Sequence, residues 1–239
     1  MKKFLLPLFL GAFGTIFTSC EDTFCVNGSG PVEQREFIVP DFQSVDVRTT
    51  AIVYLTQNSN SSIPIEARGQ SNILDELDIY VSNGTLVIGD RECFNTDEEL
   101  VIFVDFDEIE EIELNSSAEI IGTNIFETDD LELSINGSGR IDIELLGDDI
   151  ESFITGSGLL VLHGECDDHN LEIAGSGFND SFGLRSNDAD IRISGSGSAQ
   201  VYVMDALNVL ITGSGSVYYK GFPDISATIT GSGSLVNNN

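Results

Sequence analysis

Residues 135–139 read Ile-Asn-Gly-Ser-Gly, and this short frame decides the fold because it returns at a nearly constant interval. Gly-Ser-Gly triplets stand at 137–139, 156–158, 175–177, 195–197, 213–215 and 231–233, so their starts lie 18 to 20 residues apart. The residue two places before each triplet is always isoleucine: Ile135, Ile154, Ile173, Ile193, Ile211 and Ile229. A fixed period of this length is typical of a protein built from stacked repeats.

Apolar and polar residues alternate on both sides of each triplet. In the first repeat, Leu133 and Ile135 precede the triplet, and Ile141 and Ile143 follow it with Asp142 between them. Alternation with a period of two indicates strands with one buried face. A unit of this size cannot bury its apolar face alone, whereas identical units stacked about 4.8 Å apart can. The sequence therefore predicts an all-β fold, a parallel β-helix or β-solenoid with 18 to 20 residues per repeat.

The triplets are predicted to be the corners of the coils. Glycine permits a tight bend with positive φ, and serine is small enough to repeat there without crowding. A phosphate-binding loop would lead into a helix, and a nucleophile elbow reads Gly-x-Ser-x-Gly. The triplets match neither motif, because each one runs into another alternating strand and none has the Gly-x-Ser-x-Gly spacing. The predicted corner serines are Ser138, Ser157, Ser176, Ser196, Ser214 and Ser232.

The amino terminus has the pattern of a bacterial lipoprotein signal peptide. Two lysines precede an apolar run from Phe4 to Phe17, which is too short for a transmembrane helix and leads into Thr18-Ser19-Cys20. This ending resembles a lipobox, in which the cysteine becomes the acylated first residue, although Phe17 replaces the more usual small aliphatic residue. We expect residues 1–19 to be removed and Cys20 to carry the lipid. An ordinary signal peptide cut elsewhere, leaving Cys20 as a plain thiol, is the alternative.

The rest of the chain is expected to form one domain. Residues 20–37 read as an anchor segment and linker, and residues 38–239 as a single β-helical domain. Within it, residues 111–236 are the regular repeats. Degenerate copies of the pattern around Leu114 and Val47 extend it backward. Residues 38–110 also hold a predicted hairpin, so we expect an irregular amino-terminal part that seals one end of the stack.

The chain is strongly acidic, with 40 Asp and Glu residues against 10 Lys and Arg residues and a net charge of −30. Loss of the signal peptide removes two lysines and leaves Lys220 as the only one. Nucleic-acid binding depends on cations that displace counterions from the phosphates, so the composition argues against nucleic acid as a partner. We expect the acidic residues to keep the protein soluble and to occupy outward strand positions.

Three cysteines remain once Cys20 is acylated: Cys25, Cys93 and Cys166. An odd set allows at most one disulfide. Pairing of Cys25 with Cys93 would close a long loop and stabilise the fold by a few kcal/mol. The sequence leaves the choice of pair open.

One polar cluster stands apart from the repeat. His163, Cys166 and His169 lie within seven residues and are candidate ligands for zinc or another transition metal. Their spacing, His-x-x-Cys-x-x-His, is not the paired spacing of structural zinc sites. The competing interpretation is a coil corner that gathers polar residues, and we expect no cofactor.

Several blocks of the sequence resemble one known family. They are Phe42–Val47, Val53–Gln57, Asn83–Ile88 and the serial triplets, which together span roughly residues 38–236. In this order they resemble the family of autotransporter adhesins called the head GIN domain, found in exported proteins of bacteria related to Bacteroides. The resemblance implies a right-handed β-helical fold at the cell envelope, and it supplies no catalytic residues.

The leading functional hypothesis is a lipid-anchored envelope protein, at the outer membrane or cell surface, that binds glycans or proteins through a strand face or its serine corners. Tyr202, Tyr218 and Phe222 are candidate sugar-binding aromatics, whereas the register of Tyr219 predicts that it faces the core. The alternative is a polysaccharide lyase or hydrolase, for which Asp148-Asp149 and Asp188 to Asp190 could supply acids. Sparse, scattered basic residues argue against that alternative. A structural or sensory component of the envelope is the third hypothesis.

Overall fold

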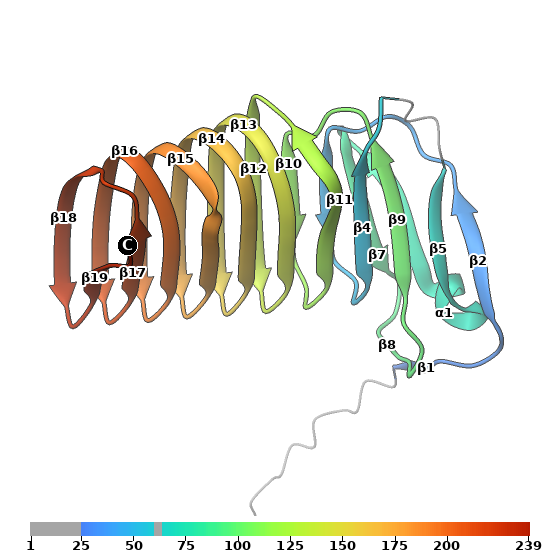
Figure 1. Cartoon of the computed structure of the whole chain (residues 1–239). Coiled ribbons are helices and arrows are strands. Elements are labelled where there is room, and N and C mark those ends of the chain that lie inside the picture. Colours follow the sequence, from blue (N-terminus) through green and yellow to red (C-terminus); the bar gives the residue numbers. More distant parts are fainter. Residues whose placement is uncertain (1–24, 60–63) are drawn as a thin grey trace, which may run out of the picture.

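The computed structural model describes residues 25–59 and 64–239 as one elongated stack of coils (Figure 1). Of the described residues, 71% lie in strands, which form a β-solenoid of about 7 turns. This confirms the predicted all-β solenoid. Cys20 lies outside the described residues.

The amino-terminal part holds nine strands and the only helix among the described residues. Its elements are β1 (Val26–Asn27), β2 (Val32–Phe37), β3 (Ser44–Val47), β4 (Ile52–Gln57), β5 (Ile65–Gln70), α1 (Ser71–Glu76), β6 (Leu77–Ser82), β7 (Thr85–Asp90), β8 (Phe94–Asn95) and β9 (Val101–Phe106).

The remaining strands form the regular coils. They are β10 (Glu111–Leu114), β11 (Glu119–Glu127), β12 (Asp130–Gly137), β13 (Arg140–Gly156), β14 (Leu159–Gly175), β15 (Phe178–Gly195), β16 (Ser198–Gly213), β17 (Ser216–Lys220), β18 (Asp224–Gly231) and β19 (Ser234–Asn237). The four longest strands, β13 to β16, curve over one edge of the solenoid and so contribute to both of its faces (Figure 1).

The isoleucines that precede the triplets form one column of stacked side chains. Parallel pairing aligns Ile135 with Ile154, Ile154 with Ile173, and so on through Ile193 and Ile211 to Ile229. The column extends backward through Leu114 and Val47, as the degenerate copies of the frame predicted. Ile135 to Ile211 are at most 2% exposed, so each coil covers the isoleucine of the coil before it.

The Gly-Ser-Gly corners require glycine at both ends of the triplet. Gly195 has φ of +130°, and a Cβ there would lie 2.4 Å from the carbonyl oxygen of Gly175 in the preceding coil. At the third position, a Cβ on Gly197 would lie 2.6 Å from the side chain of Ile173. Any side chain at either position would push adjacent coils apart.

The amino-terminal part continues the stack and then closes it. Strands β3 and β4 pair in parallel with β10 and β11, whereas β2, β5, β6 and β7 include antiparallel pairs. The predicted Asn83-Gly84 hairpin joins β6 to β7, and both residues have positive φ. The structure differs from the expected boundary at residue 38, because β2 pairs antiparallel with β5 along its whole length. Part of the segment expected to be a linker therefore belongs to the sheet.

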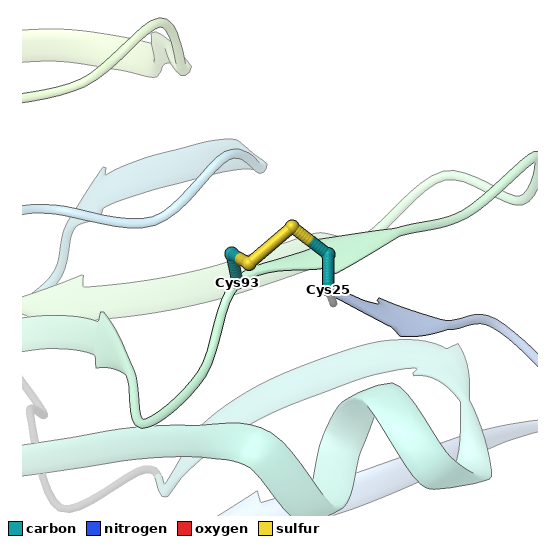
Figure 2. The surroundings of a disulfide bond; sticks show 2 residues. All are labelled: Cys25 and Cys93. Carbon is teal, nitrogen blue, oxygen red and sulfur yellow. A yellow bond between two sulfur atoms is a disulfide. The ribbon is translucent and has the colours of Figure 1, made fainter. Parts of the chain in front are cut away.

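A disulfide joins Cys25 to Cys93, with Cα atoms 4.7 Å apart, and leaves Cys166 as a buried free thiol (Figure 2). The bond lies where the short strands β1 and β8 pair in parallel. It ties the start of the described chain to the amino-terminal half of the solenoid across 68 residues. The pairing that the sequence left open is thus settled in favour of the long loop.

Candidate functional site

The six corner serines form one edge of the regular coils, which we call the serine edge: Ser138, Ser157, Ser176, Ser196, Ser214 and Ser232. All six are exposed. Backbone hydrogen bonds hold the row, since the amide of each serine from Ser157 onward donates to the first glycine of the preceding triplet, over 2.8 to 2.9 Å. The serine edge is therefore a regular ladder of hydroxyl groups with no ionisable side chain in it.

Carboxylates form the opposite edge, where the long strands turn over. The structure stacks Asp130, Asp149, Asp168 and Asp188 at equivalent positions of successive coils. A second column runs beside the first. We call the two columns the acidic edge: Asp129, Asp130, Asp148, Asp149, Asp167, Asp168 and Asp188. Adjacent members of one column are separated by about 4.8 Å, the spacing of neighbouring strands.

Like charges at this spacing disfavour ionisation. Partial burial and the neighbouring carboxylates Asp149 and Asp188 raise the pKa of Asp168. A groove of about 980 Å³ runs along this side, and Asp129, Asp148 and Asp167 line it. Its basic lining residue, Arg185, is 3.7 Å from Glu165. The acidic edge therefore attracts cations and repels polyanions.

Three of the acids considered for a polysaccharide enzyme gather on this edge, whereas Asp190 pairs with Arg192, with 3.0 Å between Oδ1 and Nη2. Asp149 and Asp188 both flank Asp168, and Asp148 lies in the adjacent groove. A lyase that acts on acidic polysaccharides needs positive charge to hold its substrate, whereas this edge presents stacked negative charge. The geometry gives that alternative no specific support.

The three candidate metal ligands point to different environments. His163 is exposed, with Nε2 3.9 Å from Asp142, whereas Cys166 and His169 are buried. Within residues 25–59 and 64–239, no group of three or more His, Cys, Asp and Glu side chains is arranged to hold a metal ion. The structure does not bring these candidates together, because His163 faces the solvent whereas Cys166 and His169 are buried in the core.

Burial sets the chemistry of the two inner residues. It raises the pKa of the Cys166 thiol to about 12, with the carboxylates Asp168, Asp167 and Asp149 adding to the effect. It lowers the pKa of His169 to about 4. His169 Nε2 lies 3.3 Å from Ser152 Oγ, so the neutral ring and the hydroxyl share a hydrogen bond inside the core.

Four aromatic side chains of the last coils are partly or largely exposed. Tyr202 and Tyr218 are half-buried, and Phe222 is 89% exposed in the loop after β17. Strand register places Tyr202 beside Lys220, whose ammonium lies 4.1 Å from the ring centroid of Phe182. We call these four rings the aromatic patch: Phe182, Tyr202, Tyr218 and Phe222. Tyr219 packs against the core, as its register predicted.

The acidic edge is the feature that the sequence analysis missed. Its signal was present, because Asp130, Asp149, Asp168 and Asp188 are spaced by 19, 19 and 20 residues, the same intervals that separate the corresponding triplets. The buried hydrogen bond between His169 and Ser152 was not predicted from the sequence either. These two residues occupy core columns that are otherwise aliphatic: Ile150 and Ala189 flank His169, and Leu133 and Leu171 flank Ser152.

No helix among the described residues is long and apolar enough to cross a membrane. Searches of curated proteins give no match to this chain.

Several crystal structures share the fold, among them three from Bacteroides and Parabacteroides species. A "putative adhesin" from Bacteroides fragilis is 23% identical, with a TM-score of 0.84, and the match covers 89% of this chain and 100% of that one. A "putative adhesin" from Parabacteroides merdae is 19% identical, with a TM-score of 0.72 and coverage of 90% and 99%. A "putative lipid binding protein" from Parabacteroides distasonis is 23% identical, with a TM-score of 0.74 and coverage of 90% and 100%.

The family model described as "Putative auto-transporter adhesin, head GIN domain" matches residues 41–223. That match spans most of the chain and includes most of the irregular amino-terminal part and nearly all of the regular coils. The chain therefore belongs to the head GIN domain family of auto-transporter adhesins.

Proposed function

We propose that this protein is a lipid-anchored adhesin of the cell envelope, displayed at the cell surface, which binds glycan through its aromatic patch. The observation that carries the proposal is the position of the patch. It lies on the last coils, whereas β1 and β2 lie at the opposite end of the stack (Figure 1). A lipid on Cys20 would hold the amino-terminal end at the membrane and direct the patch away from it.

The chemistry of the patch fits a sugar ligand. Aromatic rings offer a flat apolar face to the C–H groups of a pyranose, and a tyrosine hydroxyl adds a polar handle at the ring edge. Tyr202 and Tyr218 come from paired strands, so the sheet fixes their relative position before binding. Rings held on a rigid sheet lose little conformational entropy when they bind a ligand.

The charge distribution limits the ligand further. The acidic edge repels polyanions, while the aromatic patch has Lys220 as its neighbouring cation. We therefore propose neutral glycans, or glycans with few acidic groups, as ligands. The family and the names of the structural neighbours support an adhesive role for the chain.

A binding assay with matched variants tests the proposal. The purified protein is applied to a glycan array and to cells that carry the glycans it selects. The double variant Tyr202→Ala with Tyr218→Ala should weaken binding at least tenfold, because stacking of each ring on a ligand contributes about 1 kcal/mol. Tyr80→Ala is the control, since Tyr80 is 41% exposed on β6 in the amino-terminal part and outside the patch. Equal binding by the double variant and the wild type would refute the proposed site.

Lipid attachment requires a separate test. Metabolic labelling with an alkyne fatty acid should modify the wild type and leave Cys20→Ser unlabelled. If the two proteins incorporate equal label, Cys20 is not the attachment site. Crosslinking in native membranes then distinguishes an adhesin from a structural or sensory component, because the latter would have a constant protein partner within its own envelope.

A further inference from the structure

The carboxyl-terminal end of the solenoid exposes its core. In β18, Ile225 is 43% exposed and Ile229 is 40% exposed. Their partners in the preceding coil, Leu207 and Ile211, are completely buried. The difference arises because, among the described residues, no strand covers β18 on its outer side. This end therefore displays the apolar interior that every earlier coil covers with the next one.

The backbone of this end is open as well. Strand β18 pairs with β16, and β19 pairs with β17, and in the described part of the chain neither has a partner beyond it. The carboxyl-terminal tail lies at Gly221 and not along β18, since the Asn239 side chain donates to the Gly221 carbonyl and accepts from the Gly221 N–H. An open strand edge presents alternating N–H and C=O groups, which only another strand satisfies fully.

The edge strands at the two ends of the solenoid differ in their charge. At the amino-terminal end, β2 carries Glu33, Arg35 and Glu36, and charges of this kind protect an edge from pairing. At the other end, β18 reads Asp-Ile-Ser-Ala-Thr-Ile-Thr-Gly, so its only charge is Asp224 at the first position. A regular, β-branched, almost uncharged edge is suited to strand pairing.

The charge distribution indicates which strand can pair there. A chain with a net charge of −30 repels its own copies over most of its surface. Residues 107–130 hold nine acidic residues and no basic residue, whereas residues 206–239 hold only Lys220 and Asp224 as charged side chains. The carboxyl-terminal coil is thus the surface where two copies can approach with little repulsion.

We propose that this end binds a second copy of the chain, with the two β18 strands antiparallel about a two-fold axis at Ala227. In this register Ile225 of each copy lies opposite Ile229 of the other, so all the exposed core residues meet within one face of the joined sheet. The contact is isologous and closed, and it produces a dimer instead of a fibre. Because this inference rests on the open end alone, it stands whether or not the aromatic patch binds glycan.

Two measurements test the dimer: its mass in solution and the crosslinking of residues that the proposed contact places opposite each other. Sedimentation of the chain from Glu21 onward, which keeps every described residue, should show a dimer across the micromolar range. Added salt should strengthen the dimer by screening the acidic surfaces. The variant Ile225→Lys should be monomeric, while Phe103→Lys, a change at a residue equally exposed on β9, should remain dimeric.

A crosslinking variant protects the test against a folding artefact. Residues directly opposite in an antiparallel pair have Cβ atoms about 4.5 to 5.5 Å apart, close to the separation in a disulfide. Ala227→Cys should therefore form a covalent dimer on mild oxidation, whereas Ser196→Cys, on the serine edge, should not. A monomer at all concentrations, or a dimer that Ala227→Cys fails to crosslink, would overturn the proposal.

Discussion

Protonation of one buried histidine should destabilise the whole solenoid at mildly acidic pH. His169 is 1% exposed in the core and shares a hydrogen bond with Ser152. At equivalent positions the neighbouring coils have Ile150 and Ala189, so His169→Leu restores an aliphatic column. The variant removes the titration and keeps the shape of the coil.

The magnitude follows from the pKa. Burial lowers the pKa of His169 from 6.5 to about 4, so the folded protein binds this proton less readily than the unfolded chain. Stability from the neutral ring is fully present above pH 6.5 and is lost as pH falls toward 4. Linkage gives a loss of about 2 kcal/mol at pH 5 and about 3 kcal/mol at pH 4, relative to neutral pH.

The assay is urea unfolding of wild type and His169→Leu at several pH values. The difference in unfolding free energy between the two proteins is the informative quantity, because the carboxylates of the acidic edge titrate in both and cancel. Repacking the leucine adds an offset that does not depend on pH. We expect the difference to grow by about 3 kcal/mol between pH 7.5 and pH 4 in favour of the variant. Two parallel curves would refute the reasoning.

Three further predictions concern the corners and the cysteines. Gly195→Ala should lower the unfolding free energy by about 2 kcal/mol or more, because its φ of +130° excludes side chains and its Cβ would meet the Gly175 carbonyl; an equally stable variant, measured by urea unfolding beside Ser196→Ala as control, would contradict this. Replacing Cys25 and Cys93 by serine should cost about 4 kcal/mol, since the bridge closes a 68-residue separation, and an unchanged thermal midpoint would count against it. The buried Cys166, with its pKa raised to about 12, should react with a thiol reagent only on unfolding, so rapid labelling of the native protein would contradict its placement.

The sequence predicted the regular coils well because their determinants are local and repeated. An isoleucine two places before each glycine triplet specifies both the inward face and the corner, and the structure stacks Ile154 on Ile135 accordingly. Such a pattern needs no knowledge of distant contacts. The same reasoning located Tyr219 toward the core and Tyr218 toward solvent.

The remaining features depend on contacts that a local pattern does not encode. Residues 32–37 carry three charges and no clear alternation of apolar residues, yet they form a strand because the exposed edge of β5 accepts them. His169 resembled a metal ligand in the sequence, and the coil register instead placed it between Ile150 and Ala189. The acidic edge arises only when carboxylates from separate coils are stacked. In each case the register between coils decides the outcome.

Thiol labelling of intact cells tests the proposal that the solenoid is displayed on the outside of the cell. Ser138→Cys and Ser214→Cys place exposed thiols on the serine edge, near the middle and near the distal end of the regular coils. The wild type provides a low background, because Cys166 is buried and Cys25 is bonded to Cys93. A membrane-impermeant maleimide should label both variants on intact cells as fully as after lysis. Labelling that appears only after the outer membrane is permeabilised would contradict surface display.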